Sequence, residues 1–325
     1  MTDVFVGIDI GKFKFDVAIV SQQHKSMHRE FQNNREGFKS LLKWLGKEVL
    51  DREPHFCMEA TGRYGEALAF FLYDAGCAVS VVNPLCIKNY GKSKLRRTKN
   101  DKIDAILIGV FCQSEHPRLW EPLPMESRKL QEMTRELYRI KDLVAQEKNR
   151  LKAGTHCKTV QDSMESRLFY LEAQVEDLEA IINAHVEKSA KLKKQRNLLV
   201  TIPGIAERTA NALLAEIPDV HRFKGVRQLV AYAGLAPSEK SSGTMRGQTH
   251  ISKVGSTRLR KLLYMPAVCG KRYNPVVINL CDRIEAKGKS KMIALGAAMR
   301  KLLHVVYGIL KSEKPFNAKL HLRKA

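Results

Sequence analysis

The sequence predicts an α/β domain followed by two helical regions, and three observations along the chain support this fold class. Residues 4–113 alternate between short apolar, β-branched runs and segments whose apolar residues have helical spacing. Residues 125–195 carry a heptad-like apolar repeat between charged positions. The remainder combines short apolar helices with many basic residues. We therefore expect three parts, over residues 1–120, 125–195 and 196–325.

The first part has the element order of an RNase H-like fold. Apolar runs, turn residues and helical spacing predict three strands, then a helix, a strand, a helix, a strand and a last helix. The segments are residues 4–20 (a hairpin of two strands), 26–32, 36–50, 55–58, 65–75, 78–82 and 101–113. In this fold an antiparallel first half is extended by parallel strands.

Four acidic residues occur where that fold would bring them together. Asp9 interrupts an apolar strand, where a carboxylate is costly unless it is paired, coordinated or at an exposed edge. Glu59 ends the strand that follows the first helix, and Asp101 and Asp104 share one face of a helix start. Clustered carboxylates repel one another unless Mg²⁺ or Mn²⁺ lies between them, and two such ions can support phosphodiester chemistry. Taken singly, Asp101 could be a helix N-cap and Asp104 a surface acid.

The middle part predicts two long helices. Apolar residues recur at steps of three and four from Leu130 to Val144 and again from Leu168 to Ile182. The pattern fits either an antiparallel hairpin within one chain or a coiled coil between chains. We expect this part to act in spacing or oligomerisation and to carry no catalytic residue.

The charge distribution favours a nucleic-acid partner. The net charge is +22, and the segment from Arg222 to Ala325 holds 22 lysines and arginines against four acids. A charge of this sign and size points first to nucleic acid and second to an anionic membrane surface. No apolar run reaches the roughly 18 residues of a membrane span, and no secretory signal is evident, so we expect a cytoplasmic protein without a membrane partner. The seven cysteines show no Cys-x-x-Cys pair, so neither a disulfide framework nor a zinc ribbon is indicated.

Two segments of the last part suggest contact with DNA. Residues 198–217 predict two short helices around Pro203-Gly204-Ile205, similar to a helix-hairpin-helix whose glycine turn offers N–H groups to a phosphate. An ordinary helical hairpin is the alternative. Residues 233–262 are rich in glycine, serine and base, and composition alone favours a Ser/Gly linker or simple phosphate binding. Cations flanking Ser241-Ser242 could also stabilise a displacement at phosphorus.

Basic side chains near these segments are the expected DNA contacts. Three of them lie beside the predicted acid cluster, where a solvated basic loop is an equal alternative. The expected contacts are Arg96, Arg97, Lys99, Gly204, Arg246, Lys253, Arg258 and Arg260.

Five ordered motifs spread over nearly the whole chain resemble one family. They are VGIDIGK (6–12), MEATGRY (58–64), TKNDKIDA (98–105), IPGIAERTA (202–210) and the serine segment from AGLAPSEKSSG (233–243) to HISKVG (250–255). Together they resemble the insertion-sequence transposases that have an N-terminal DEDD, RuvC-like domain and a C-terminal transposase domain. The family includes site-specific DNA invertases.

The resemblance implies a site and a reaction. Asp9, Glu59, Asp101 and Asp104 match the DEDD tetrad and would bind Mg²⁺, and a serine of the C-terminal segment would bond covalently to DNA during strand exchange. Counting back from Ser252-Lys253 selects Ser241 as that serine, whereas matching the following glycine selects Ser242. The resemblance also implies a dimer or tetramer with a site shared between subunits, and some members use a structured guide RNA.

Two other functions fit parts of the sequence. A Holliday-junction-resolvase-like nuclease would use the same acids with water as the nucleophile, but a small resolvase does not need the C-terminal part. A basic nucleic-acid-binding protein with an inactive RNase H-like domain is the second alternative, and the presence of all four acids argues against it. A covalent protein–DNA adduct would separate the recombinase from both.

Overall fold

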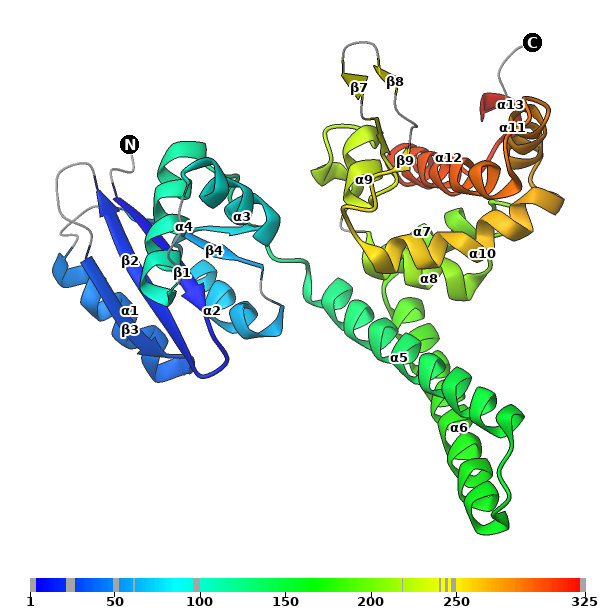
Figure 1. The fold of residues 1–325 in the computed structure, drawn as a ribbon, viewed down its shortest axis with the longest axis horizontal. Coiled ribbons are helices and arrows are strands. Elements are labelled where there is room, and N and C mark those ends of the chain that lie inside the picture. The colour runs from blue at the N-terminus through cyan, green and yellow to red at the C-terminus, as the bar shows by residue number, and fades with distance from the viewer. Residues whose placement is uncertain are drawn as a thin grey trace. The chain divides into compact units, whose positions relative to one another are not determined.

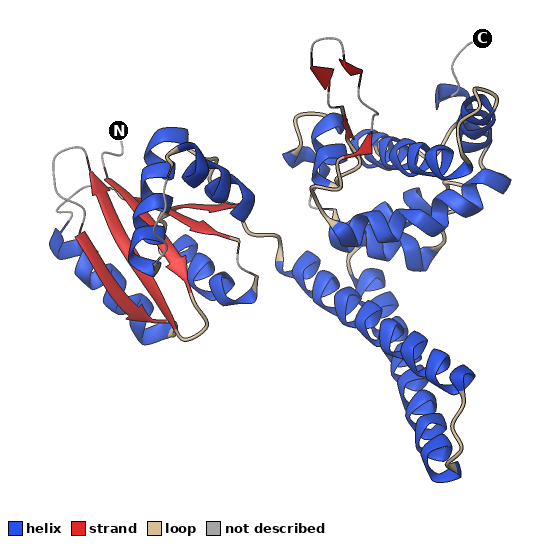
Figure 2. Cartoon of the chain, in the orientation of Figure 1, coloured by secondary structure: helices blue, strands red, loops and turns tan. Residues whose placement is uncertain are grey.

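The computed structural model describes residues 4–21, 27–48, 53–60, 62–95, 100–217, 219–239, 241–242, 245–246 and 250–321. They belong to two compact units, Met1–Pro122 and Leu123–Ala325 (Figure 1). The first unit is mixed α/β and the second is mainly helical (Figure 2). This is the predicted fold class.

The N-terminal unit contains five strands and four helices among its described residues. Its elements are β1 (Val4–Ile10), β2 (Lys14–Ser21), β3 (Met27–Gln32), α1 (Arg35–Glu48), β4 (His55–Glu59), α2 (Arg63–Asp74), β5 (Ala78–Val82), α3 (Pro84–Ser93) and α4 (Asp101–Glu115). The sequence analysis did not predict α3. Asn83 caps this helix by accepting a hydrogen bond from the Leu85 N–H, and Pro84 occupies its first turn.

The strand order of the sheet is β3-β2-β1-β4-β5. β1 pairs antiparallel with β2 and parallel with β4, and β4 pairs parallel with β5. An antiparallel half extended by parallel strands is the RNase H-like arrangement that the element order predicted. The carboxyl ends of β1 and β4 therefore lie at the same edge of the sheet.

One face of this sheet is tightly packed against α4. A Cβ atom on Gly7 would lie 2.0 Å from the carbonyl oxygen of Ala105 and 2.2 Å from the backbone nitrogen of Gly109. Only glycine at position 7 lets α4 approach β1 this closely. Since successive strand residues alternate between faces, Asp9 lies on the same face as Gly7, toward α4. The opposite face carries Val6 and Ile8, which are fully buried in the apolar cluster with α1 and α2.

The C-terminal unit is built almost entirely from helices. Its elements are α5 (Met125–Ala153), α6 (Lys158–Lys188), α7 (Ala190–Val200), α8 (Glu207–Glu216), the 3₁₀ turn η1 (Val220–Arg222), α9 (Val226–Tyr232), β6 (Pro237–Ser238), β7 (Ser241–Ser242), β8 (Met245–Arg246), β9 (His250–Ile251), α10 (Thr257–Tyr273), α11 (Pro275–Glu285), α12 (Lys291–Ser312) and α13 (Ala318–His321).

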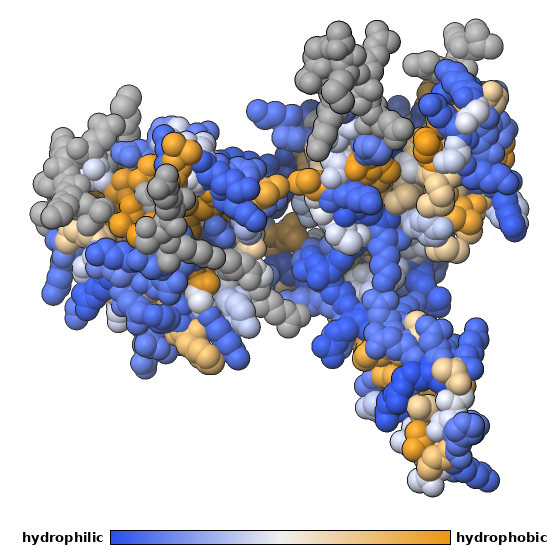
Figure 3. Space-filling view, viewed as in Figure 1, coloured by the Kyte–Doolittle hydropathy of each residue, from blue (hydrophilic) through white to orange (hydrophobic). Residues whose placement is uncertain are grey.

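Helices α5 and α6 form an antiparallel hairpin within one chain, the first of the two alternatives that the heptad pattern left open (Figure 1). Ion pairs join the helices, with Lys148 Nζ 2.7 Å from Glu172 Oε1. Glu147 is buried and pairs with Arg150 on its own helix and with Arg167 across the hairpin. The visible surface is mostly hydrophilic with scattered apolar patches (Figure 3).

The base of the hairpin belongs to the core of the C-terminal unit. Leu130 and Val186 are fully buried in the same apolar cluster as Leu199 of α7 and Leu302 of α12. The predicted boundary between the middle and last parts at residue 195 stays a prediction. The apolar cluster contains residues from both sides of this boundary. Among the described residues one helix, α12, is long and apolar enough to cross a membrane by length and composition. Its buried side chains line this core, as in many soluble proteins.

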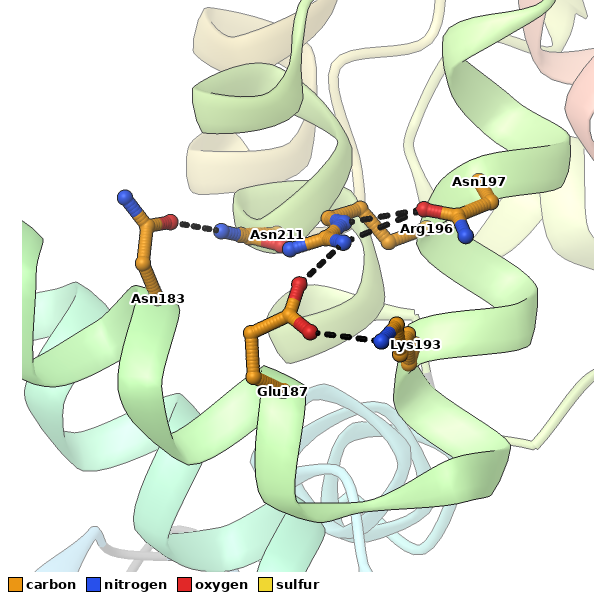
Figure 4. Close-up of polar contacts among 6 residues, drawn as sticks. All are labelled: Asn183, Glu187, Lys193, Arg196, Asn197 and Asn211. Carbon is orange, nitrogen blue, oxygen red and sulfur yellow. Dashed lines mark hydrogen bonds and ion pairs between the residues drawn. The ribbon is translucent and has the colours of Figure 1, made fainter.

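A buried arginine fixes the junction between α6 and α7. Arg196, 5% exposed, donates from Nη2 to Glu187 Oε1 at 2.5 Å and to Asn197 Oδ1 at 3.1 Å (Figure 4). Beside it, Asn211 Nδ2 of α8 donates to Asn183 Oδ1 of α6 at 2.9 Å. Buried polar groups that are paired in this way specify one arrangement of the helices. The hairpin is therefore firmly attached to the C-terminal unit.

Candidate active site

The acid site lies at the carboxyl edge of the sheet, on the face covered by α4. Asp9 stands opposite Asp16 in the register of β1 and β2. On its other side Ile8 pairs with Met58, so Glu59 follows Met58 on β4 at the same level at which Asp9 follows Ile8 on β1. Asp9 and Glu59 therefore occupy neighbouring positions on adjacent strands, as the sequence analysis expected.

Helix α4 brings two more acids to this edge. Asn100 caps the helix by accepting a hydrogen bond from the Ile103 N–H at 2.8 Å, so the N-cap is Asn100 and not Asp101. Asp101 and Asp104 occupy the first turn, where carboxylates interact favourably with the helix dipole. The close contact between Gly7 and α4 sets the distance of this helix end from Asp9.

The electrostatics of Asp9 record its acidic surroundings. Partial burial, together with the carboxylates of Asp104, Asp101 and Asp16, raises the pKa of Asp9 from 3.8 to about 6. Burial makes the largest contribution and Asp104 the next. A carboxyl group that is crowded by like charges prefers to hold its proton. Three members of the predicted tetrad therefore interact in the structure.

The donor set fits a hard divalent cation by its chemistry. Carboxylate oxygens are the ligands that Mg²⁺ and Mn²⁺ prefer, and a cation would offset the repulsion that raises the pKa of Asp9. Over the ranges that the structure describes, no three His, Cys, Asp or Glu side chains are grouped closely enough to hold a metal ion. The acids are close, but they do not converge on one point as the sequence predicted.

A fifth acid, Asp16, was missed by the sequence analysis. It is 6% exposed, stands opposite Asp9, and lies 2.7 Å through Oδ1 from Nε2 of His28 on β3. The alternation Lys14-Phe15-Asp16-Val17 places Asp16 on the Asp9 face only once the hairpin register is known. The short turn between Ile10 and Lys14 is the sequence signal from which this register could have been predicted.

Replacing Asp9 with asparagine is expected to raise the thermal unfolding midpoint of metal-free protein near pH 7.5. Because the folded-state pKa of about 6 exceeds the ordinary value of 3.8, ionised Asp9 costs stability once the pH has risen through that range. The side chain is partly exposed, so solvent screening reduces the cost to about 1 kcal/mol, or roughly 2–4 °C. Differential scanning calorimetry measures the difference.

The same experiment has two internal controls. Near pH 4 the wild-type carboxyl is largely protonated, so the gain of Asp9→Asn should disappear. Glu30→Gln removes an acid that forms a surface ion pair with Lys14, and it should not stabilise the protein. A variant that is less stable than wild type near pH 7.5 would show that Asp9 is not destabilised by its neighbours.

The serine segment forms a two-stranded ribbon that rises from the helical core (Figure 1). At its base β6 pairs with β9, with Pro237 opposite Ile251. Further along, β7 pairs with β8, and Ser241 stands opposite Arg246 while Ser242 stands opposite Met245. The predicted linker is thus a hairpin. The side chains of Ser241, Ser242 and Arg246 lie outside the described part of the structure.

Arg260 and two glycines hold the base of this ribbon. Arg260 Nη1 donates to the carbonyl oxygens of Ala233 at 2.9 Å and of Gly255 at 3.2 Å. Gly255 has a φ of 147°, and a Cβ there would lie 2.5 Å from the backbone nitrogen of Gly234. The segment after α9 and the segment before α10 are therefore in close backbone contact at these two glycines. Arg260, predicted to contact DNA, has its guanidinium engaged in this support.

The other predicted DNA contacts differ in accessibility. Lys253 and Arg258 are exposed beside the ribbon. Gly204 forms the predicted turn between α7 and α8, but its Cα faces α10, since a Cβ there would lie 3.0 Å from the Pro266 carbonyl oxygen. Arg96, Arg97 and Lys99 lie outside the described residues.

Comparisons with known proteins place both units. Residues 6–156 match the DEDD model of the IS110 group, described as a transposase, and residues 196–281 match the model of the transposase IS116/IS110/IS902 family. The chain is 34% identical over 327 residues to the pilin gene-inverting protein of Moraxella bovis, covering 99% of this chain and 100% of that protein. The pilin gene-inverting protein of Moraxella lacunata gives the same identity and coverage.

Among solved structures the chain is similar to Thermus thermophilus RuvC. The identity is 14%, the match covers 36% of this chain and 98% of that one, and the TM-score is 0.27. A TM-score this low adds nothing to the fold assignment, which rests on the strand order and pairing described above.

Proposed function

This chain belongs to the IS116/IS110/IS902 transposase family, and from that premise we propose that it is a site-specific DNA recombinase that inverts or moves a DNA segment. It is an enzyme of DNA recombination that catalyses strand transfer. The proposal adds that strand cleavage and rejoining depend on Mg²⁺ or Mn²⁺ and pass through a covalent serine–DNA bond. Full-length similarity to the pilin gene-inverting proteins favours inversion, including that of a pilin gene.

The observation that carries the proposal is the electrostatic coupling of the acids. Asp104 and Asp101 raise the pKa of Asp9, and Glu59 stands beside Asp9 on the neighbouring strand. Evolution for stability alone would not favour several carboxylates at one sheet edge, because their repulsion is unfavourable. Perturbed ionisable groups of this kind are typical of functional sites.

Asp9, Glu59, Asp101 and Asp104 would hold the divalent cation. When bound, such a cation neutralises charge that develops on phosphate oxygens during displacement. The chain's own contribution is to fix the four carboxylates on β1, β4 and the first turn of α4. The contact of Gly7 with α4 keeps the helix end near the strand, and the Asn100 cap keeps its first turn in place.

The serine would link protein and DNA. Its hydroxyl oxygen bonds to phosphorus while the bond from phosphorus to one deoxyribose oxygen breaks, and the proton lost by the serine is matched by the proton gained by the released hydroxyl. Attack by a hydroxyl of another strand reverses the step and restores a phosphodiester. The energy of the broken bond is kept, so rejoining requires no ATP. In the backbone register of β7 and β8, Ser241 stands opposite Arg246.

A water-using nuclease is the second candidate function. It would use the same carboxylates, and the RNase H-like sheet with acids at its carboxyl edge suits it equally well. It would leave the serine ribbon and its support from Arg260 without a catalytic use. For that reason we favour the serine mechanism.

The proposal also names partners. DNA would lie on the basic C-terminal unit, mainly through phosphate contacts, and would reach the acid site for cleavage. A homodimer or homotetramer, and a structured guide RNA, stay predictions from the family resemblance. Light scattering with and without DNA, and sequencing of RNA that copurifies with the protein, test them.

A plasmid assay tests the function as a whole. The plasmid carries a marker flanked by inverted copies of DNA that borders this protein's gene, and junctions are sequenced after expression of wild type or Asp9→Asn. Seamless inverted junctions that depend on Asp9 would support an invertase, and insertions elsewhere would support a transposase. Linearised plasmid without any new junction would contradict recombination.

A further inference from the structure

An exposed phenylalanine stands at the edge of the acid site. Phe13, 74% exposed, lies in the turn between β1 and β2, four residues after Asp9. Tyr64, 49% exposed, lies in the first turn of α2, five residues after Glu59. Both turns leave the carboxyl ends of adjacent strands, so both aromatic residues belong to the edge that carries the acids.

The backbone beneath these residues is firmly held. Gly11 N–H donates to the Lys14 carbonyl oxygen at 2.9 Å, and Asn33 N–H donates to the Phe13 carbonyl oxygen at 2.8 Å. The side chain of Asn33 then joins the two segments, because its Nδ2 donates to the carbonyl oxygens of Gly11 at 2.9 Å and of Tyr64 at 3.0 Å. An ordered turn that presents a bare aromatic ring loses little conformational entropy when a ligand stacks on it.

The chemistry around the ring suits a nucleobase. Lys12 Nζ lies 4.9 Å from the centre of the Phe13 ring, which places a cation beside the aromatic surface. Among the described residues no aromatic ring contacts Phe13, and because the residue is 74% exposed, most of its surface is open to a ligand. Aromatic rings with adjacent cations are typical of sites for unpaired bases, because every base has a flat face that can stack.

The acids themselves give a reason for such a contact. Carboxylates repel the phosphate backbone, so DNA gains little affinity from charge at this edge before a cation is bound. Stacking of an uncharged base does not suffer from that repulsion. A strand held through its bases could be kept beside the acids while the basic C-terminal unit holds the phosphates of other nucleotides.

We propose that Phe13, mounted by Asn33 and flanked by Lys12, is a stacking site for one unpaired base of the DNA strand at the acid site. The inference rests on the proposed function, since it takes DNA as the substrate. It adds that the DNA strand is locally unpaired at the acid site. Phe13 would stack on any of the four bases and would not contribute to sequence specificity.

Binding of a short single-stranded DNA to the full-length protein, with metal withheld, tests the proposal. Phe13→Ala is expected to weaken binding of the single strand roughly 5- to 150-fold, the range for loss of one stacked base, and binding of the matching duplex less than about 2-fold. Phe169→Ala is the matched control, because Phe169 on α6 is 77% exposed and lies in the other unit. It should change neither affinity.

A second pair of variants gives a local readout. The tryptophan fluorescence of Phe13→Trp should be quenched when single-stranded DNA binds, whereas that of Phe169→Trp should not change. The wild-type protein gives the background fluorescence of Trp44 and Trp120, which is subtracted. Equal loss of single-strand and duplex binding, no loss, or an unquenched tryptophan at position 13 would overturn the proposal. Quenching by single-stranded RNA alone would overturn DNA as the occupant.

Cleavage is scored separately from this binding. Absence of metal-dependent cleavage by a protein whose tryptophan at position 13 is quenched by DNA would contradict the proposed function and leave the stacking site standing. Normal cleavage by a Phe13→Trp protein whose fluorescence is not quenched by DNA would contradict the stacking site and leave the proposed function standing.

Discussion

Alanine in place of the nucleophilic serine is expected to leave a protein that binds DNA but forms no covalent adduct with it. Alanine has no nucleophilic atom that could bond to phosphorus, so the adduct should fall about 10³-fold or more, the scale seen when an enzyme nucleophile is deleted. The protein is incubated with Mg²⁺ and DNA carrying its recombination site, then denatured and examined by mass spectrometry. Ser241→Ala and Ser242→Ala are compared, and the variant that loses the adduct identifies the nucleophile.

Ser238→Ala supplies the matched control for this experiment. Ser238 lies on β6 of the same ribbon, paired with His250, and its replacement should leave the adduct at the wild-type level. Peptide mapping of the adduct should place the DNA on the ribbon. Cut strands without any adduct, lost on Asp9→Asn, would remove the serine mechanism and leave the water-using nuclease in its place.

The centre of the N-terminal sheet could be predicted from the sequence because strands β1 and β4 are buried on both faces. β1 and β4 appear as short, nearly continuous apolar runs bounded by turn residues, a pattern that few other structures share. The acid positions followed from the same pattern, since a carboxylate inside or at the end of such a run needs a special reason. Asp9 and Glu59 were found in this way.

Other features depend on contacts that no local pattern contains. Asp16 became a member of the acid site only through the register of β1 with β2. The predicted strand 78–82 ends before Asn83-Pro84, and these two residues are also a capped helix start, because α3 follows them. The helix is stabilised by packing against α4, where Ile87 lies in one apolar cluster with Leu107 and Ile108.

The turn at Gly204 shows the same limit in the C-terminal unit. Its sequence suits phosphate binding through backbone N–H groups, and it equally suits close packing of a helical hairpin. The structure places Pro266 and Gly270 of α10 against its Cα. Likewise, heptad spacing is the same for helices that pair within a chain or between chains, and only the three-dimensional structure shows that α5 pairs with α6.

Asp9→Asn is expected to lower strand cleavage roughly 10²- to 10³-fold while DNA binding is kept. The substitution preserves size and removes the charge that would hold the cation, and losing that charge stabilisation is worth several kcal/mol in the transition state, with each tenfold equal to about 1.4 kcal/mol. Asp104→Asn should have a similar effect, because Asp104 is the acid that most strongly raises the pKa of Asp9. Cleavage of a labelled oligonucleotide over a range of Mg²⁺ concentrations measures both.

Glu30→Gln separates loss of the metal site from a general loss of acidic charge. Glu30 stands opposite Asp16 on the same sheet and forms a surface ion pair with Lys14, yet it does not belong to the tetrad, so its replacement should leave cleavage within about 2-fold. The same Asp9→Asn protein should be more stable than wild type without metal, so its loss of cleavage cannot result from unfolding. A loss of function joined to a gain of stability is the expected mark of an acid retained for chemistry. Retention of full cleavage by Asp9→Asn would remove the acid site from the mechanism.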